Sequence, residues 1–387
     1  MNVISAAREQ PPWEDAVEVG RVRDLLTALP PLVESESLSR LRRLLARVAS
    51  GKALVVQAGD CAEDPAECTA EDVARKAELL GTLAGVMEET TQLPVVRVGR
   101  IAGQFSKPRS SATEWIGGVE LPVYRGHMVN GPEPDPVKRR PDPGRLLAGY
   151  WAAREVMGHL AAASPAPIDP HLWTSHEALL LDYEVPMKRR DRVGQLVLTS
   201  THWPWIGERT RQLDGAHIAL LSDVVNPVAC KVGPTTETDE LLGLCARLDP
   251  EREPGRLTLI ARMGADAIAD RLPPLVEAVR AAEYPVIWMV DPMHGNTVRT
   301  SEGRKTRVVD TLIREVMAFQ TVVHQAGGVA GGIHLETTPD EVTECVGTRG
   351  DIDRAGDKYT TLCDPRLNPR QAVSVVSAWR TQTTNQS

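Results

Sequence analysis

Four residues far apart in the chain combine the side-chain types that bind transition metals. They are a thiol, an imidazole and two carboxylates, at Cys61, His294, Glu336 and Asp364. This mixture of soft and hard ligands suits Mn, Fe, Co or Zn better than Mg or Ca. Taken singly, Cys61 could also be a buried filler or a nucleophile, and His294 could be an ordinary hydrogen-bonded histidine. The metal hypothesis therefore depends on a fold that brings the four together.

A second set of residues consists of cations in a chain that is acidic overall. The net charge is -8, yet basic side chains stand near the ends of several apolar runs, at Arg100, Lys107, Arg209, Lys231 and Arg262, with Glu208 beside them. The Arg guanidinium binds phosphate or carboxylate through two parallel hydrogen bonds, and Lys supplies a point charge, so the set favours an anionic substrate. Each cation alone could equally be a solvated partner of the acidic residues.

Apolar runs that alternate with helical stretches would place both sets at one edge of a sheet. Lys231, Arg262 and Asp291 end three successive runs about 30 residues apart, which is the length of a βαβ unit. Such strands indicate a parallel sheet covered on both faces, and eight of them favour an α/β fold of the (β/α)8 TIM barrel type, whose strand ends share the catalytic face. The runs are residues 53–59, 94–101, 171–175, 195–201, 226–233, 257–262, 285–291 and 332–336.

The other segments complete the predicted organisation. Residues 1–52 have apolar residues at helical spacing, which predicts an N-terminal helical extension to a catalytic barrel of residues 53–387. Residues 110–146 are rich in Pro and charge and predict a long loop after the second strand. The six Cys include no CxxC pair, which argues against a zinc ribbon or a disulfide scaffold.

Composition and charge exclude several classes of partner. An acidic chain argues against nucleic acid or an anionic membrane as the main partner. Residues 1–16 lack the apolar core of a signal peptide, and no stretch reaches the roughly 18 apolar residues of a membrane span. We therefore expect a cytoplasmic protein without nucleic-acid or membrane partners, in which the N-terminal helices could mediate a homo-oligomer.

Several long motifs resemble the type II, plant-like 3-deoxy-D-arabino-heptulosonate 7-phosphate (DAHP) synthases. They occur in order between about residues 12 and 380, and include GKALVVQAGDCAED, RIAGQFSKPRS, WIGERTRQLDGAHI, NPVACKVGP, VIWMVDPMHGNT, GGIHLETTPDEVTECVG and CDPRLNPRQA. The resemblance implies a metal-dependent (β/α)8 barrel that condenses phosphoenolpyruvate with erythrose 4-phosphate, the first step of the shikimate pathway and aromatic amino acid biosynthesis. Phe105 and Ser106 stand where the family pattern has Tyr and Ala, and neither is a predicted ligand.

The resemblance also implies roles for the residues that match its motifs. The divalent metal, with Mn or Co expected and Zn a third candidate, would be bound by Cys61, His294, Glu336 and Asp364. Phosphoenolpyruvate would be surrounded by Arg100, Lys107, Glu208, Arg209, Lys231 and Arg262, and the sugar phosphate by Arg109, Ser110 and Lys305. The expected catalytic residues are Lys107, Glu208, Arg262 and His294, the first two beside the water that adds at carbon 2.

The link between segments 153–164 and 171–180 is short, whereas longer family members insert helices there that are associated with feedback by aromatic amino acids. We therefore expect an enzyme insensitive to Phe, Tyr and Trp, as in forms dedicated to secondary metabolism. Two alternatives stay open: a relative that uses another aldose phosphate, such as an amino or imino analogue, and a non-catalytic scaffold. Cys363, next to Asp364, could also form a redox disulfide with Cys61.

Overall fold

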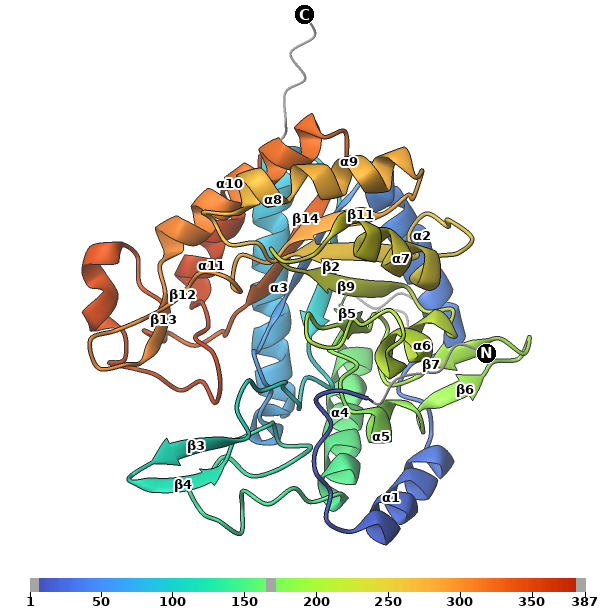
Figure 1. The fold of residues 1–387 in the computed structure, drawn as a ribbon, viewed down its shortest axis with the longest axis vertical. Coiled ribbons are helices and arrows are strands. Elements are labelled where there is room, and N and C mark those ends of the chain that lie inside the picture. Colours follow the sequence, from blue (N-terminus) through green and yellow to red (C-terminus); the bar gives the residue numbers. More distant parts are fainter. Residues whose placement is uncertain (1–6, 165–171, 381–387) are drawn as a thin grey trace, which may run out of the picture. The chain divides into compact units, whose positions relative to one another are not determined.

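Eight short strands form the main sheet of a mixed α/β fold of the (β/α)8 barrel type (Figure 1). The computed structural model describes residues 7–164 and 172–380. The strand order is β5-β2-β1-β14-β11-β10-β9-β8. The predicted fold class is therefore confirmed. The strands are β1 (Leu54–Gly59), β2 (Val95–Arg100), β5 (Trp173–Thr174), β8 (Trp205–Ile206), β9 (Val228–Val232), β10 (Leu257–Ala261), β11 (Ile287–Val290) and β14 (Ala330–Glu336).

The chain divides into two compact units, each built from discontinuous segments. The first unit comprises residues 1–39, 62–74 and 100–226, and the second comprises residues 40–61, 75–99 and 227–387. The predicted division into an extension of residues 1–52 and a barrel of residues 53–387 stays a prediction.

The second unit contains the middle of the main sheet. Parallel pairing joins β1 to β14, β14 to β11, β11 to β10 and β10 to β9. Both β9 and β10 are buried along their whole length, which explains why they read as continuous apolar runs. The register pairs Gly59 with Glu336 and Ile260 with Lys231, so the polar residues at the strand ends gather at one edge.

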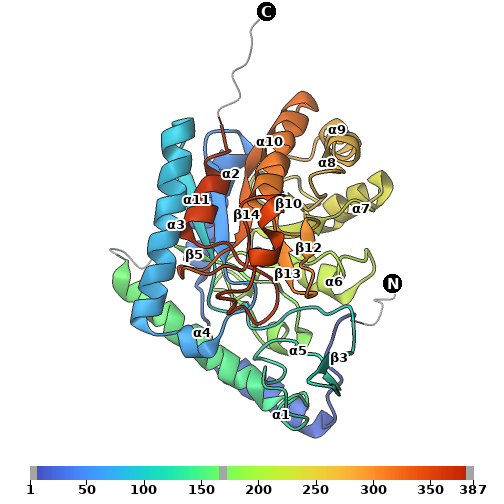
Figure 2. The same ribbon diagram turned by 90° about the vertical axis from the view of Figure 1, so that its left-hand side faces the viewer.

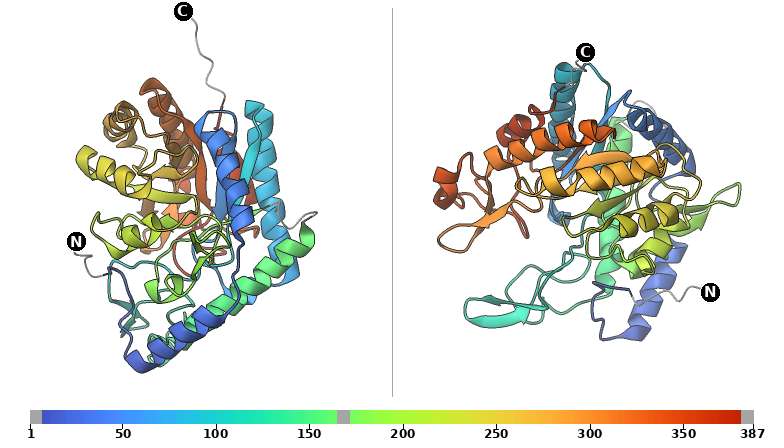
Figure 3. Two further views of the ribbon diagram at one scale, coloured as in Figure 1. Left: turned by 90° about the vertical axis from the view of Figure 1, so that its right-hand side faces the viewer. Right: turned by 45° about the horizontal axis from the view of Figure 1, so that its top comes forward.

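Helices cover this part of the sheet, as the tilted view in Figure 3 shows. α10 packs against β14 and β11 and also against α8, α9 and α11, while α7 packs against α9. In α7, Leu241, Leu244, Cys245 and Leu248 form the buried stripe that helical spacing predicts. The bounds are α3 (Ala70–Thr91), α7 (Thr238–Leu248), α8 (Ile268–Arg271), α9 (Pro273–Ala281), α10 (Val309–Gln325) and α11 (Pro369–Val376), with the hairpin β12 (Thr297–Arg299) and β13 (Lys305–Arg307) and the 3-10 helix Arg349–Arg354.

The first unit holds β5 and β8, and backbone hydrogen bonds join each of these strands to a residue close to the other in the chain. The N–H of Trp205 donates to the carbonyl of His176 at 3.1 Å, and that of Trp203 to the carbonyl of Thr174 at 3.1 Å. α1 and α4 pack against each other along one side of this unit (Figure 2). The remaining bounds are α1 (Ala16–Ala28), α4 (Gly144–Ala163), α5 (Leu181–Glu184), α6 (Ala216–Ser222) and the 3-10 helix Pro65–Glu67.

The two helices predicted in residues 1–52 are present. The side chain of Asp15 accepts from the N–H groups of Val17 and Glu18 and so caps α1. The second helix, α2 (Ser35–Ala49), ends just before Gly51, whose φ of +71° only glycine adopts readily. No helix of the described residues is long and apolar enough to cross a membrane. The short link behind the feedback prediction, residues 165–170, lies outside the described residues.

Two local predictions were wrong. The run 195–201 is not a barrel strand: β7 (Leu196–Leu198) pairs antiparallel with β6 (Lys188–Arg190), because Asp191 accepts from the N–H groups of Val193 and Gln195 and turns the chain back. The short strand β8 joins the main sheet instead. The predicted loop 110–146 contains the hairpin β3 (Thr113–Ile116) and β4 (Val119–Pro122), whose turn glycines have the positive φ values of a tight hairpin.

Candidate active site

The second unit brings three predicted metal ligands together. One ligand atom each of Cys61, Glu336 and Asp364 lies within 4.8 Å of the other two. Cys61 follows β1 and Glu336 ends β14, and the parallel register that pairs Gly59 with Glu336 makes the two segments neighbours. The backbone N–H of Asp364 donates to the Cys61 sulfur at 3.3 Å, which fixes the third residue against the first.

His294 lies beside this cluster with a lone pair turned toward it. Its Nδ1 is 2.8 Å from Asp291 Oδ2 and its Nε2 is 3.7 Å from Glu336 Oε1. Burial lowers the pKa of His294 to about 4, although Asp291 opposes the shift, so the ring is neutral at pH 7. Since Nδ1 donates to the Asp291 carboxylate, Nε2 is an acceptor that faces another acceptor. A cation between these two atoms satisfies both, so the donor set fits a divalent metal.

The two carboxylate ligands are each held by a basic residue outside the four predicted metal ligands. The guanidinium of Arg307 pairs with Glu336 at 2.9 Å, and the Lys305 ammonium pairs with Asp364 at 2.7 Å. Both basic residues belong to β13, two positions apart, so they point to the same side of the strand. Arg307 is fully buried; burial opposes its charge, but Glu336 raises its pKa. Partners of this kind orient metal ligands and balance their negative charge.

Asp291 links the metal region to one of the predicted substrate cations. Its Oδ2 accepts from the Lys231 ammonium at 2.7 Å as well as from His294, and its Oδ1 accepts from the backbone N–H of Met293 at 3.1 Å. Asp291 is fully buried, and although burial opposes ionisation, His294 and Lys231 hold its pKa well below the usual value. The carboxylate therefore stays charged and orients both partners.

Arg262 is positioned by the strand next to that of Lys231. Its backbone N–H donates to the carbonyl of Val232 at 2.9 Å, directly beyond the parallel ladder of β9 and β10. Lys231 and Arg262 thus stand at the carboxyl ends of adjacent strands, as the apolar runs predicted. Together they could bind an anion through the ammonium charge of Lys231 and the two-pronged hydrogen bonding of the Arg262 guanidinium.

A buried ion network anchors the segments that carry Cys61 and Asp364. Arg366 donates to Asp60 at 2.8 Å and to Glu344 at 3.0 Å, and Lys76 pairs with Asp60 at 2.9 Å. Burial opposes the charge of Asp60, but these two cations lower its pKa. Because Asp60 precedes one ligand and Arg366 follows another by two positions, the network fixes the spacing between them.

In the first unit, the predicted anion-binding residues have local partners. Arg100 ends β2 almost fully buried, with its guanidinium carbon 5.2 Å from the centre of the Trp205 ring. Arg209 donates to the Ser110 hydroxyl at 2.7 Å, so the structure brings two predicted residues together. Trp205, which sequence analysis did not select, gives the Arg100 side chain a flat surface to stack on.

Three further predicted residues lie on loops of the first unit. Glu208 accepts from Arg211 at 2.9 Å, and Arg109 donates to Glu114 at 3.4 Å. The backbone N–H of Lys107 donates to the carbonyl of Arg125 at 2.9 Å. Sequence analysis missed the partners Arg211, Glu114 and Arg125, because loop contacts leave no periodic signal. Predicted Arg109 is therefore at least partly engaged by a neighbouring carboxylate.

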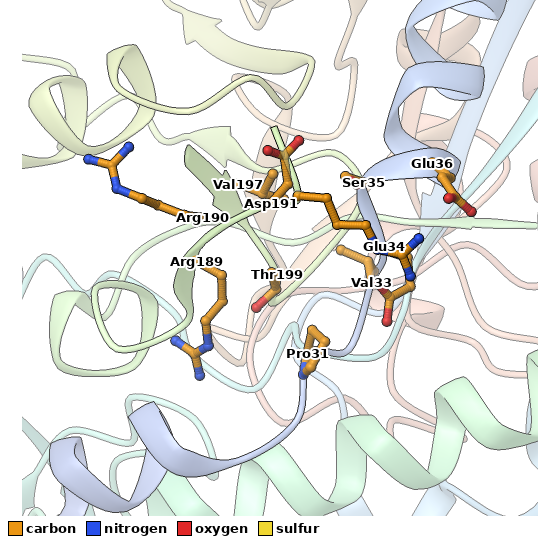
Figure 4. Close-up of a pocket in the computed structure, with 11 residues that line it drawn as sticks. Pro31, Val33, Glu34, Ser35, Glu36, Arg189, Arg190, Asp191, Val197 and Thr199 are labelled. Carbon is orange, nitrogen blue, oxygen red and sulfur yellow. The ribbon is translucent and has the colours of Figure 1, made fainter. Parts of the chain in front are cut away.

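A pocket of about 510 Å³ in the first unit lies away from all of these residues (Figure 4). One wall is formed by residues 189–192, which include three arginines, and the other by residues 31–36. Arg189 donates to the carbonyls of Leu26 and Leu29 and so closes the C-terminal end of α1. Arg190 points away from Glu34. Arg189 therefore stabilises the C-terminal end of a helix.

Comparison with known proteins agrees with the sequence motifs. The model of the Class-II DAHP synthetase family matches residues 4–170 and 164–378. A "Probable phospho-2-dehydro-3-deoxyheptonate aldolase" of Pseudomonas fluorescens is 56% identical over 378 residues, covering 97% of this chain and 94% of that protein. A "Phospho-2-dehydro-3-deoxyheptonate aldolase" of Streptomyces coelicolor is 42% identical over 420 residues, covering 95% and 93%.

The solved structure of a phospho-2-dehydro-3-deoxyheptonate aldolase from Francisella tularensis resembles this fold. The TM-score is 0.57 at 14% sequence identity, with 92% of this chain and 95% of that chain covered. At that identity the likeness concerns the fold alone. The family match and the identities over nearly the whole chain carry the assignment: this chain is an enzyme, a transferase, that belongs to the Class-II DAHP synthetase family.

Proposed function

We propose that this enzyme is a metal-dependent 3-deoxy-7-phosphoheptulonate (DAHP) synthase that condenses phosphoenolpyruvate with erythrose 4-phosphate and releases phosphate. The observation that carries the proposal is the acceptor pair of His294 Nε2 and Glu336 Oε1, 3.7 Å apart beside Cys61 and Asp364. Relatives that match nearly the whole chain carry this activity in their names.

Cys61, His294, Glu336 and Asp364 would hold the divalent metal, for which we propose Mn or Co, with Zn as the third candidate. Bound there, the metal would supply Lewis-acid polarisation of a carbonyl oxygen. Thiolate and imidazole ligands favour these metals over Mg and Ca. Arg307 and Lys305 would keep the carboxylates oriented, and Asp291 would keep the His294 proton on Nδ1.

The cations that match the family motifs would bind phosphoenolpyruvate. Lys231 and Arg262, at the ends of adjacent strands, would contact its anionic groups, as would Arg100 and Arg209. Arg100 is held flat against Trp205, which limits the freedom its guanidinium loses on binding. Lys107 and Glu208 would hold the water that adds to the substrate. We assign Lys107, Glu208, Arg262 and His294 as catalytic residues on this basis.

The reaction forms a bond between carbon 3 of phosphoenolpyruvate and the aldehyde carbon of erythrose 4-phosphate. Water adds at carbon 2 and one of its protons passes to a base such as Glu208. The resulting hemiketal then loses phosphate, which takes the proton of the hydroxyl, and the carbon 2 carbonyl forms. The new alkoxide, from the aldehyde oxygen, takes up a proton. Fixed cations at the phosphate and carboxylate supply positioning and charge stabilisation at these steps.

The sugar phosphate would be bound by Arg109, Ser110 and Lys305. Ser110 accepts from Arg209, which connects this group to the phosphoenolpyruvate cations. Lys305 pairs with Asp364, so the same ammonium borders the metal ligands. Arg109 also pairs with Glu114, and we expect it to contribute least of the three.

We further propose a cytoplasmic homo-oligomer that is insensitive to Phe, Tyr and Trp and that serves secondary metabolism. The support is the short link after α4 in the sequence. Inhibition by any of the three amino acids at physiological concentration would contradict this part of the proposal without touching the activity itself.

Phosphate release in the presence of a panel of aldose phosphates tests the activity. We expect release from phosphoenolpyruvate only when erythrose 4-phosphate is present, with one DAHP formed per phosphate. Faster turnover of an amino or imino analogue would identify a relative with another substrate. The absence of turnover with every aldehyde would point to a scaffold.

A further inference from the structure

Glu315 is a buried carboxyl to which the proposed reaction assigns no role. It lies in the middle of α10 with no exposed surface, and burial raises its pKa to about 8 although several N–H donors oppose the shift. Placing a carboxyl in such surroundings is unfavourable unless its oxygens are hydrogen-bonded. Its contacts therefore indicate what it does.

The two carboxyl oxygens of Glu315 reach two different loops. Oε1 accepts from the backbone N–H of Gly264 at 2.9 Å, in the loop that follows β10. Oε2 accepts from the side-chain amide of Asn296, in the loop that follows β11. One side chain of α10 thus joins the ends of two neighbouring strands of the second unit.

Asn296 is itself held in one orientation. Its Oδ1 accepts from the backbone N–H of Ala265 at 3.0 Å, and its Nδ2 donates to the carbonyl of Pro292 at 2.8 Å as well as to Glu315. The amide cannot turn over without breaking these contacts. It therefore presents only N–H to Glu315, which must accept.

The two loops also cross at a pair of glycines. Gly264 and Gly295 have φ values of +85° and +95°, in the region that favours glycine. A Cβ on Gly264 would lie 3.1 Å from the Gly295 carbonyl oxygen, and a Cβ on Gly295 would lie 2.9 Å from the Gly264 nitrogen. The backbones are thus in direct contact beside the Glu315 carboxyl.

These loops carry residues of the proposed site, since Arg262 lies two positions before Gly264 and His294 directly before Gly295. We propose that Glu315 is a positioning residue that holds the loop of Arg262 and the loop of His294 in fixed register. The inference rests on the proposed function for the roles of those two residues. It predicts that one change at position 315 weakens the binding of both the metal and phosphoenolpyruvate.

The test is the variant Glu315→Gln, with Mn²⁺ and phosphoenolpyruvate affinities measured by calorimetry on the full-length chain. Both oxygens of a carboxyl group keep lone pairs that accept hydrogen bonds, whether the group is ionised or protonated, but the amide nitrogen of Gln cannot accept. A Gln can therefore accept from Gly264 or from Asn296 but not from both. We expect Mn²⁺ affinity to fall about tenfold, as for other outer partners of metal ligands. Phosphoenolpyruvate affinity should fall in the same variant. An unchanged value for either ligand would overturn the inference.

Asp249→Asn is the matched control. Asp249 is also buried in the second unit and accepts from the N–H of Glu253, but it follows α7. Arg256, whose charge opposes the rise of the Asp249 pKa, precedes β10 at the other end of that strand. Like Glu315→Gln, the Asp249→Asn variant should lower the melting temperature. Unlike Glu315→Gln, it should leave the affinities for Mn²⁺ and phosphoenolpyruvate unchanged. Equal loss of affinity in both variants would show a general effect of destabilisation and overturn the positioning role.

Because both affinities are measured without turnover, failure of wild-type phosphate release would reject the proposed activity separately.

Discussion

The predicted metal ligands and the predicted cations of the first unit differ in how their side chains are held. In the second unit, His294, Glu336 and Asp364 each have a charged partner within 3 Å. In the first unit, Arg100 stacks on the Trp205 ring, Arg209 donates to the Ser110 hydroxyl and Arg109 pairs with Glu114 at 3.4 Å. Three metal ligands of the second unit are thus held by close ion pairs, whereas the contacts of the first-unit cations include an aromatic ring, a hydroxyl and a longer ion pair.

The largest expected effect is the loss of a metal ligand. Cys61→Ala or His294→Ala should lower metal affinity and phosphate release by more than the roughly 10–100-fold that outer partners cost. Metal content after dialysis and initial rates measure the two quantities. Retained activity in both variants would break the site assignment and with it the contrast between the units.

Next in size is removal of an outer partner. Asp291→Asn should weaken metal binding and activity about 10–100-fold, because the neutral amide no longer fixes the proton of His294 on Nδ1 and leaves Lys231 without its anion. Calorimetry with Mn²⁺ and steady-state rates measure this loss. Wild-type metal affinity in Asp291→Asn would mean that the ligands need no such support.

A smaller effect is expected from the first unit. Arg100→Lys should raise the KM for phosphoenolpyruvate about tenfold, the value of one charge-assisted hydrogen bond, while metal affinity stays unchanged. Arg109→Lys is the matched comparison and should change the KM for erythrose 4-phosphate less, because Arg109 is shared with Glu114. A change in metal affinity in Arg100→Lys would erase the distinction between the two regions.

The smallest expected effect concerns stability and pH. The pKa of Glu315 is raised to about 8 in the fold, so its contribution to stability is present below the ordinary value of 4.5 and is lost as pH rises through 8. The free energy of unfolding of the wild type should therefore fall relative to Glu315→Gln between about pH 5 and pH 8.5. Urea denaturation of both proteins at a series of pH values measures this free energy. The same pH dependence in both proteins would contradict the raised pKa.

Much of the fold and part of the site could be predicted from the sequence, because strand ends in a parallel sheet meet at one edge. Cys61, Glu336, Lys231 and Arg262 lie at such ends, and their neighbours follow from the register. The short strand β8 was missed, since two residues carry no pattern, and the longer run 195–201 was chosen in its place.

The partners of the ligands could not be predicted, because they depend on contacts between distant segments. Arg307 and Arg366 look like surface cations in the sequence, yet both are buried against carboxylates. Asp291 ends an apolar run, but nothing in the sequence shows that its carboxylate joins Lys231 to His294. Glu315 sits in an ordinary helical pattern, and only the three-dimensional packing exposes its link to two loops.

The central claim is that a divalent metal at Cys61, His294, Glu336 and Asp364 enables the condensation. Its most direct test is phosphate release from phosphoenolpyruvate and erythrose 4-phosphate after treatment with EDTA, with Mn, Co or Zn then restored. We predict negligible release without metal and recovery with Mn or Co, matched by DAHP formation. Full activity of protein shown to be free of metal, or no activity with any of the three, would contradict the account.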